Sequence, residues 1–381
     1  MKTITSFLIL FFFFFLSFVG NSQVSTAIKL DPNMALKKAD ADGIVWYNPK
    51  EAPFRLVGFE WIKQENVYRR LPVHPEWELS QGVEGLANHT AGGQVRFKTN
   101  SKRILINVEL REKSGMYHMP ATGQSGFDLY MELDGENRYI KTTRFSVDST
   151  HYKVELYNSE ENSMHLFTIN FPLYNGVNFL EIGIDEGAAI EPPTPFKTQG
   201  KFVIYGTSIT QGGCVCRPGM AYSNIMSRTL DVEFINLGFS GNGKGEPALA
   251  NLINQISDVR FIILDYEANT SKTIKNSLEN FVDILREKHP ETPILIMSKV
   301  RYARERKGTE KYALLISNRD FQRDLVQKKK EAGDNNIYFL DGSKVLGSKY
   351  YECAVDGVHP SDLGSQIIAD AMTKAIREIL N

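Results

Sequence analysis

Five short apolar segments in the second half of the chain alternate with segments that are long enough to form helices. This repeating pattern predicts a parallel β-sheet that is covered by helices on both faces. The strands are expected at residues 202–205, 232–237, 261–264, 294–297 and 337–340. The helices are expected to begin near Gly219, Pro247, Ser271, Thr309 and Ser361. Because ligands bind beyond the carboxyl ends of the strands in such sheets, the residues that follow each strand are the first candidates for a functional site.

The first half of the chain shows a different pattern, in which apolar and polar residues alternate. Residues 104–110 and 127–133 have this period of two, which indicates half-buried strands. The second of these segments ends in Asp134-Gly135, a dipeptide suited to a tight hairpin turn. Another return is expected at residues 158–163. A series of antiparallel strands with almost no helical periodicity predicts a β-sandwich.

A Pro-rich segment, residues 191–200, separates the two patterns and is interpreted as a linker. The predicted domains are therefore a β-sandwich at residues 24–190 and an α/β domain at residues 201–381. Two domains suit a chain of 381 residues, of which 42% are hydrophobic and 23% charged.

The first 22 residues are interpreted as a signal peptide. Lys2 precedes an apolar run, residues 7–19, and small or polar residues follow it. A membrane anchor is the alternative, but spanning a bilayer takes about 20 apolar residues, and this run is shorter. We expect a secreted or periplasmic protein that is not inserted in a membrane after the signal is removed.

Charge and cysteine content exclude several classes of protein. A net charge of -1 with scattered basic residues argues against nucleic acid as a partner. The three cysteines are too few for a disulfide scaffold, and their spacing does not match a structural zinc site. We expect neither a metal nor a cofactor.

Four stretches carry residues suited to catalysis, and three of them follow predicted strands. Ser208 comes just after the first strand and beside glycines, a position typical of an exposed nucleophile, although a serine that caps a helix is the commoner reading. Gly241 and Asn269 follow the second and third strands. Asp356 and His359 lie three residues apart, directly before the last helix. Each stretch alone is weak evidence, since turns and lone histidines are common.

Together the four stretches resemble the conserved blocks of the SGNH, or GDSL, hydrolase superfamily, in the expected order. Residues 126–130, Gly-Phe-Asp-Leu-Tyr, are similar to the GxDLY motif of an accessory β-domain in a bacterial subgroup of that superfamily. The resemblance implies a flavodoxin-like α/β/α domain with a five-stranded parallel sheet, preceded by the β-sandwich.

The resemblance also implies a role for each residue. Ser208 would be the nucleophile, His359 its general base, and Asp356 the group that orients the imidazole. The backbone N–H groups of Ser208 and Gly241 and the side-chain amide of Asn269 would bind the oxyanion. Two positions depart from the common pattern, since Thr207 and Thr270 stand where many members have Asp.

The implied function is a serine esterase that removes small acyl groups, with acetyl esters on carbohydrate expected as substrates. The alternatives are an acyltransferase with the same triad, a lipase or short-chain carboxylesterase, and a carbohydrate-binding protein that has lost catalysis. Because every expected catalytic group is present, the last of these is disfavoured.

Two further expectations concern the rim of the site. Two roles are open for a loop around Tyr117 and His118: it supplies one wall of the substrate cleft, or it only packs the β-domain against the second half. The loops that carry Cys216 and Cys353 should meet, so a disulfide between these two residues is predicted in preference to one between Cys214 and Cys353.

Overall fold

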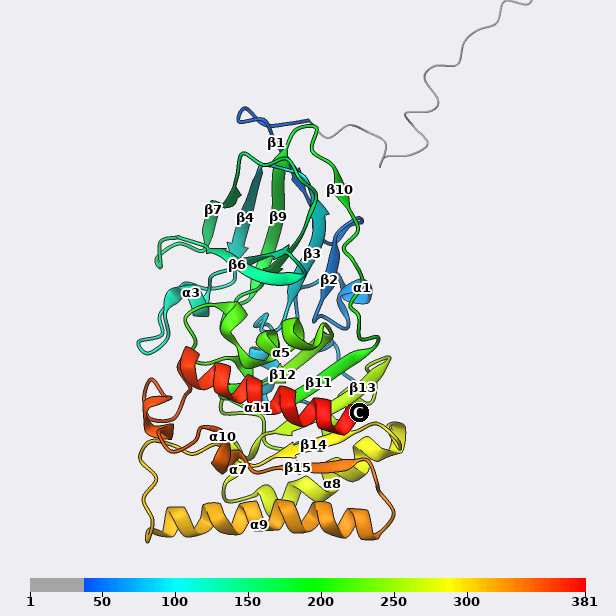
Figure 1. The fold of residues 1–381 in the computed structure, drawn as a ribbon, viewed down its shortest axis with the longest axis vertical. Coiled ribbons are helices and arrows are strands. Elements are labelled where there is room, and N and C mark those ends of the chain that lie inside the picture. The colour runs from blue at the N-terminus through cyan, green and yellow to red at the C-terminus, as the bar shows by residue number, and fades with distance from the viewer. Residues whose placement is uncertain (1–37) are drawn as a thin grey trace, which may run out of the picture. The chain divides into compact units, whose positions relative to one another are not determined.

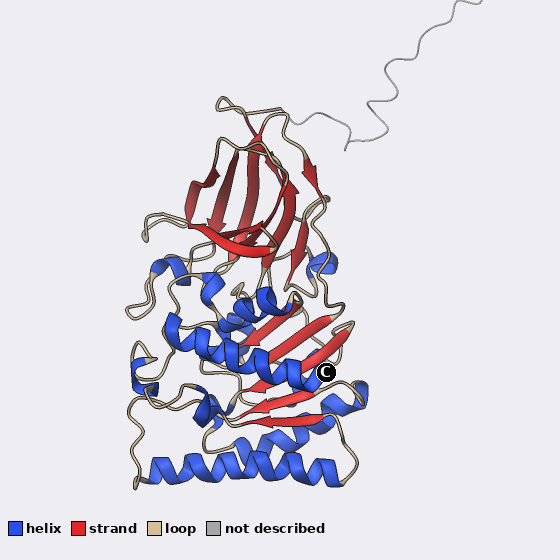
Figure 2. Cartoon of the chain, in the orientation of Figure 1, coloured by secondary structure: helices blue, strands red, loops and turns tan. Residues whose placement is uncertain are grey.

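The computed structural model describes residues 38–381, so the predicted signal peptide lies outside the described residues. Residues 39–381 form one compact unit. Its first half contains two antiparallel sheets, and its second half contains a parallel sheet with helices (Figures 1 and 2). Among the described residues, no helix has both the length and the apolar character to cross a bilayer.

The two antiparallel sheets pack face to face as a β-sandwich. The first has the order β1 (Ile44–Tyr47), β9 (Val177–Asp185), β4 (Arg103–Leu110) and β7 (His151–Asn158). The second has the order β10 (Ile190–Glu191), β3 (Gln94–Thr99), β8 (His165–Asn170), β5 (Asp128–Leu133) and β6 (Glu136–Thr142), with β2 (Arg55–Val57) also paired to β3. Alternate residues of both sheets, such as Ile104 and Ile106 of β4 and Val95 and Phe97 of β3, share one buried core.

The hairpin predicted at Asp134-Gly135 joins β5 to β6, with φ values of 53° and 79° at its two central residues. The return expected at residues 158–163 is not a hairpin. The strand before it, β7, pairs with β4, whereas the strand after it, β8, pairs with β3 and β5. This segment therefore crosses from one sheet to the other, which lets both strands bury their apolar face in the shared core.

The parallel sheet has the five predicted strands, and its order is flavodoxin-like. The order is β12 (Glu233–Gly238), β11 (Lys201–Gly206), β13 (Val259–Asp265), β14 (Ile294–Met297) and β15 (Ile337–Leu340). Val203 and Tyr205 of β11 face one helical layer, whereas Phe202 and Ile204 face the other. Burial on both faces explains why these strands are continuous apolar runs.

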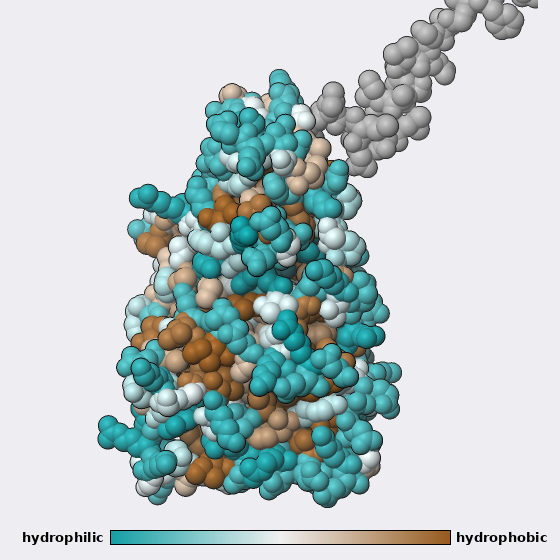
Figure 3. All heavy atoms as spheres, viewed as in Figure 1, coloured by the Kyte–Doolittle hydropathy of each residue, from teal (hydrophilic) through white to brown (hydrophobic). Residues whose placement is uncertain are grey.

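Helices cover both faces of this sheet (Figure 1). One layer contains α6 (Pro247–Ile253), α8 (Ile274–Lys288) and α9 (Glu310–Glu331), and the other contains α5 (Tyr222–Leu230) and α11 (Asp362–Leu380). The buried residues of α8 and of α11 recur every three or four positions, as an amphipathic helix requires. Polar residues cover most of the face that Figure 3 shows, with apolar ones in small patches.

Short helices occupy the connections. They are α1 (Ile62–Glu65), α2 (Gln81–Leu86), α3 (Ala121–Gln124), α4 (Ser208–Gln211), α7 (Glu267–Thr270) and α10 (Gly342–Val345), with two 3₁₀ turns at Pro218–Met220 and Tyr350–Glu352. Of these, α4 follows β11 and α7 follows β13, the two strands between which the strand order reverses direction. A ligand site is expected at this point of the sheet.

Candidate active site

Ser208 is the first residue of α4, directly beyond the carboxyl end of β11. Thr207 caps this helix, and its hydroxyl accepts a hydrogen bond from the Ile209 N–H at 3.3 Å. A side chain at Gly206 would meet Thr210 Oγ1 at 2.0 Å, so only glycine fits before the turn. The local sequence thereby holds Ser208 at the mouth of the sheet with a side chain that is almost fully buried.

Ser208, His359 and Asp356 form a continuous hydrogen-bonded chain. Ser208 Oγ lies 2.9 Å from His359 Nε2, and His359 Nδ1 lies 2.8 Å from Asp356 Oδ2. With Nδ1–H donating to the carboxylate, the imidazole has a free lone pair on Nε2 that can accept the serine proton. The predicted triad residues are therefore brought together from segments about 150 positions apart in the sequence.

The three-residue spacing between Asp356 and His359 has a structural reason. Asp356 Oδ1 accepts the backbone N–H groups of Val358 and His359 at 2.9 and 2.8 Å, across a turn in which Gly357 has a φ of +83°. Partial burial raises the pKa of Asp356. This effect is outweighed by the hydrogen bonds that the carboxylate accepts from the backbone and ring N–H groups of His359 and from the Val358 N–H, so the pKa falls to about 2. The carboxylate thus stays ionised at neutral pH, where it can stabilise an imidazolium.

The three predicted oxyanion donors follow three neighbouring strands. Gly241 follows β12 with a φ of +67°, and Asn269 lies in α7 after β13. The Asn269 side-chain amide donates to the Phe239 carbonyl at 3.3 Å, which ties α7 to the loop that carries Gly241. Within residues 38–381, the backbone N–H groups of Ser208 and Gly241 have no hydrogen-bond acceptor. All three positions thus line the same end of the sheet.

Residues of the sandwich half support Ser208 and its helix. The sequence pattern did not predict this support. The Tyr174 hydroxyl donates to the Ser208 carbonyl at 3.0 Å. Gln211, one turn after Ser208, donates from Nε2 to the Leu173 carbonyl at 3.0 Å and contacts His89 Nδ1 at 3.1 Å. Tyr174 lies after a segment that the sequence predicts as a strand of the sandwich. No motif around Tyr174 indicates that it contacts the second half of the chain.

The loop that contains Tyr117 and His118 reaches the triad. The His118 ring packs edge-on against the His359 ring with centroids 5.6 Å apart, and Tyr117 stacks on His118 at 4.4 Å. Tyr117 is 92% exposed. Both side chains line a cavity of about 470 Å³, together with Cys214, Cys216 and Asp362. The sandwich half therefore contributes one wall of a cavity beside His359.

Two family models match the chain in turn. Residues 199–377 match the GDSL-like lipase/acylhydrolase family, and residues 44–190 match the GxDLY family, described as the N-terminus of SGNH hydrolase-type esterases. The chain belongs to the SGNH hydrolase superfamily. None of the curated proteins compared with it matches the chain.

Several solved structures are similar to the chain over both of its halves. A Bacteroides ovatus protein assigned to the GDSL-like lipases is 29% identical, with a TM-score of 0.81 over 88% of this chain and 98% of that one. The salicylyl-acyltransferase SsfX3 of a tetracycline biosynthetic pathway is 20% identical, with a TM-score of 0.73 over 89% and 98%. A family two carbohydrate esterase from Cellvibrio japonicus is 16% identical, with a TM-score of 0.56 over 88% and 98%. At 20% and 16% identity, the similarities to the acyltransferase and to the carbohydrate esterase show a shared fold and nothing about a shared activity.

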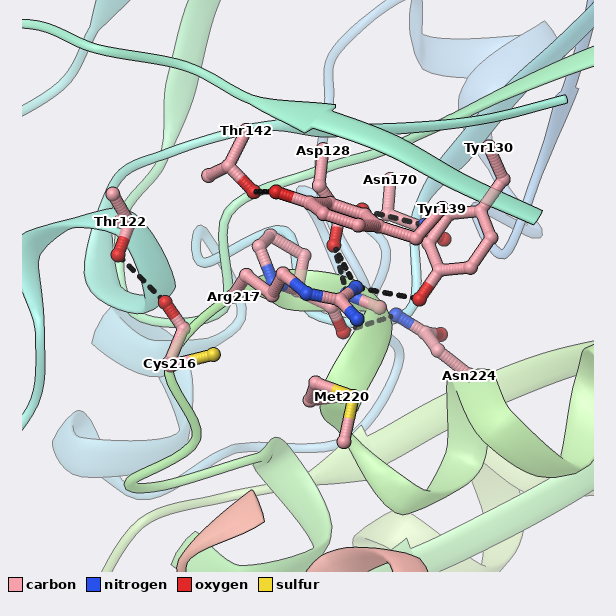
Figure 4. A network of polar contacts seen from close by, with 12 residues as sticks. Thr122, Asp128, Tyr130, Tyr139, Thr142, Asn170, Cys216, Arg217, Met220 and Asn224 are labelled. Atoms are coloured by element: carbon pink, nitrogen blue, oxygen red, sulfur yellow. Dashed lines mark hydrogen bonds and ion pairs between the residues drawn. The ribbon is translucent and has the colours of Figure 1, made fainter.

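The GxDLY motif of this SGNH protein joins its two halves (Figure 4). Asp128 is fully buried, and its Oδ2 accepts hydrogen bonds from Arg217 at 3.0 Å and from the Gly219 N–H at 2.7 Å. Arg217 also donates to the Tyr130 hydroxyl at 2.5 Å. Period two predicts Asp128 and Tyr130 on the exposed face of β5, but the segment around Arg217 covers that face, so both are buried.

The predicted disulfide between Cys216 and Cys353 is wrong for this structure, in which all three cysteines are free thiols. Cys353 is buried in the apolar layer beneath α11, and its thiol lies 3.8 Å from the Lys349 carbonyl. Cys216 is held elsewhere, because its backbone N–H donates to Asp362 and its carbonyl accepts from Thr122. The loops that carry the two cysteines do line the same cavity, but packing holds the two sulfur atoms against different neighbours.

One group of side chains within residues 38–381 has the spacing of a metal site. The ligand atoms of His118, Cys214 and His359 all lie within 4.8 Å of one another. A metal bound there would compete with Ser208 for His359. We keep His359 in the predicted triad and propose no metal for this group.

Proposed function

We propose that this protein is an exported serine esterase that removes acetyl groups from carbohydrate. Its family and fold are those of esterases and acylhydrolases. The observation that carries the proposal is the hydrogen-bonded chain from Ser208 through His359 to Asp356. A carbohydrate substrate is supported by the exposed aromatic wall beside His359, since aromatic side chains present flat apolar area to sugars, and by a fold shared with a carbohydrate esterase.

In the first half of the reaction, Ser208 Oγ attacks the carbonyl carbon of the ester while His359 Nε2 takes its proton. The carbonyl oxygen becomes an oxyanion and accepts hydrogen bonds from Ser208 N–H, Gly241 N–H and the Asn269 amide. When the intermediate collapses, the C–O bond to the sugar breaks. His359 then gives its proton to the leaving sugar oxygen, and the acetyl group stays on Ser208.

In the second half, His359 takes a proton from water as the water attacks the acetyl-serine. The same donors bind the second oxyanion. Collapse returns the proton to Ser208 Oγ and releases acetate. Asp356, ionised throughout, keeps the imidazole in the required tautomer and stabilises its cation.

Acetate release from a panel of acetylated polysaccharides, compared with 4-nitrophenyl esters of increasing chain length, tests the proposal. We expect activity on acetylated saccharides and on the acetyl ester, with a sharp loss as the acyl chain lengthens. Higher activity on long-chain esters would make the protein a lipase. Faster transfer of acetyl to an added sugar than to water would make it a transferase.

Replacing Ser208 or His359 by Ala should lower kcat by about 10⁴-fold or more, because each belongs to one cooperative unit. Asp356→Asn should also be severe, since it favours the wrong tautomer. Ser317→Ala in α9 and His151→Ala in β7 are controls that remove the same groups elsewhere and should retain full activity. Unfolding curves should show that all variants are folded. Full esterase activity in Ser208→Ala would refute the mechanism.

A further inference from the structure

A second cavity, of about 440 Å³, lies beside α7. Its walls come from residues on both sides of Asn269, from the loop between β14 and α9, and from the first turns of α9. The lining residues are Ala268, Ser271, Lys272, Lys299, Tyr302, Arg304, Glu305, Arg306, Thr309, Lys311, Tyr312, Leu314 and Leu315. None of them belongs to the proposed triad or to the proposed oxyanion donors.

The cavity adjoins the catalytic mouth on two sides. Ala268 and Ser271, which line it, flank the proposed oxyanion donor Asn269. On the other side, the Ala303 N–H of the β14–α9 loop donates to the Gly357 carbonyl at 3.0 Å, and Gly357 lies in the turn between Asp356 and His359. A substrate that is held at Ser208 and extends past α7 would therefore enter this cavity.

The lining is strongly basic although the chain as a whole has a net charge of -1. Lys299 is a buried cation that is paired with Glu305, the one acidic residue of the lining. The other four basic residues of the lining, Lys272, Arg304, Arg306 and Lys311, are exposed. Within residues 38–381 none of the four is in an ion pair, so they are available to an anionic ligand.

The uncharged part of the lining suits a sugar ring. Tyr302 and Tyr312 contribute aromatic surface, with Leu314 and Leu315 beside them. Lys299 Nζ lies 3.5 Å from the centre of the Tyr302 ring, which places a positive charge directly against this aromatic wall. Guanidinium and ammonium groups bind carboxylates through short, charge-assisted hydrogen bonds.

We propose that this basic cavity binds the carboxylate of a uronic acid next to the acetylated sugar, so that the preferred substrates are acidic acetylated oligosaccharides. The proposal rests on the esterase function above and specifies its substrate class. The triad acts on the acetyl ester, and the cavity selects the charged neighbour. Binding should be weakened by salt, since the four cations are exposed.

The test compares two forms of one substrate, acetylated oligogalacturonide and the same oligosaccharide with its carboxyl groups methyl-esterified, with acetate release as the measurement. We expect kcat/KM to be about tenfold or more higher for the acidic form, the usual effect of losing a hydrogen bond to a charged group. The preference should reside mainly in KM and should shrink as salt is added.

Arg304→Ala, Arg306→Ala and Lys272→Ala should each move the ratio of kcat/KM for the two forms toward one. Lys328→Ala is the matched control, because it removes an exposed charge from α9 outside this cavity; it should leave the ratio unchanged. Equal kcat/KM for both forms, or an unchanged ratio in the three variants, would overturn the proposal. If neither form releases acetate while 4-nitrophenyl acetate is hydrolysed, the carbohydrate esterase function itself fails instead.

Discussion

At the scale of single residues, Asn269 shows why a neutral amide stands after β13. The group that it would face becomes negative in the transition state, so an amide donor stabilises it and a carboxylate would repel it. Asn269→Ala should lower kcat by about 10²–10³-fold, the usual effect of removing one oxyanion donor, with little change in KM. Steady-state kinetics on 4-nitrophenyl acetate measure both. A change confined to KM would mean that Asn269 binds substrate instead.

Asp265, at the end of β13, is a buried carboxyl group with a raised pKa. Burial raises its pKa to about 7, a rise that the hydroxyls of Tyr222 and Thr210 oppose and the charge of Glu267 supports. Both hydroxyls donate to the same carboxyl oxygen, Oδ2, so an Asn at this position can still accept them.

Stability should therefore depend on pH through Asp265. Above a pH of 3.8 the unfolded chain releases this proton, whereas the folded protein keeps it up to about 7, so the free energy of unfolding falls as pH rises through this window. Asp265→Asn has no such proton. Its Tm relative to the wild type should rise between about pH 4 and 7 and then level off. A Tm difference that is independent of pH would contradict the raised pKa.

At the scale of elements, the loop from Met116 to Pro120 places sandwich residues against His359, the proposed general base. If this loop forms a wall of the substrate cleft, Tyr117→Ala and His118→Ala should lower kcat/KM for an acetylated oligosaccharide more than for a small aryl acetate. The ratio of the two values is the measurement, and His151→Ala in β7 is the control. Equal effects on both substrates would leave the loop with a packing role only.

At the scale of the whole molecule, the buried contact between Asp128 and Arg217 joins the two halves. Asp128→Ala removes the carboxylate that pairs with Arg217, which keeps only the Tyr130 hydroxyl as an acceptor. It also removes the acceptor of the Asn170 amide and of the Gly219 N–H. Breaking such a buried pair typically costs about 3–5 kcal/mol. Arg138→Ala, which breaks an exposed pair on β6, should cost less than about 1 kcal/mol. Urea unfolding measures the free energy of unfolding of both variants. Equal unfolding midpoints would show that the contact between Asp128 and Arg217 does not stabilise the molecule.

Local pattern was sufficient to predict much of this fold. The five strands of the parallel sheet lie where their apolar runs predicted them, because a strand buried on both faces needs apolar residues at every position. The Asp134-Gly135 hairpin was predictable for a similar reason, since two adjacent positive φ angles depend on the residues at those positions. Ser208, Asp356 and His359 stood out as one constellation only through their resemblance to a family.

Contacts between distant segments were decided by tertiary structure. Period two placed Asp128 and Tyr130 on an open face, and only the docking of the segment around Arg217 buries them. The free thiols of Cys216 and Cys353, the support of Ser208 by Tyr174 and the basic cavity beside α7 have the same origin. Periodicity records which face of a strand or helix is buried, and that information is local. Which residue meets which across the molecule depends on how the finished surfaces pack, and no single segment contains it.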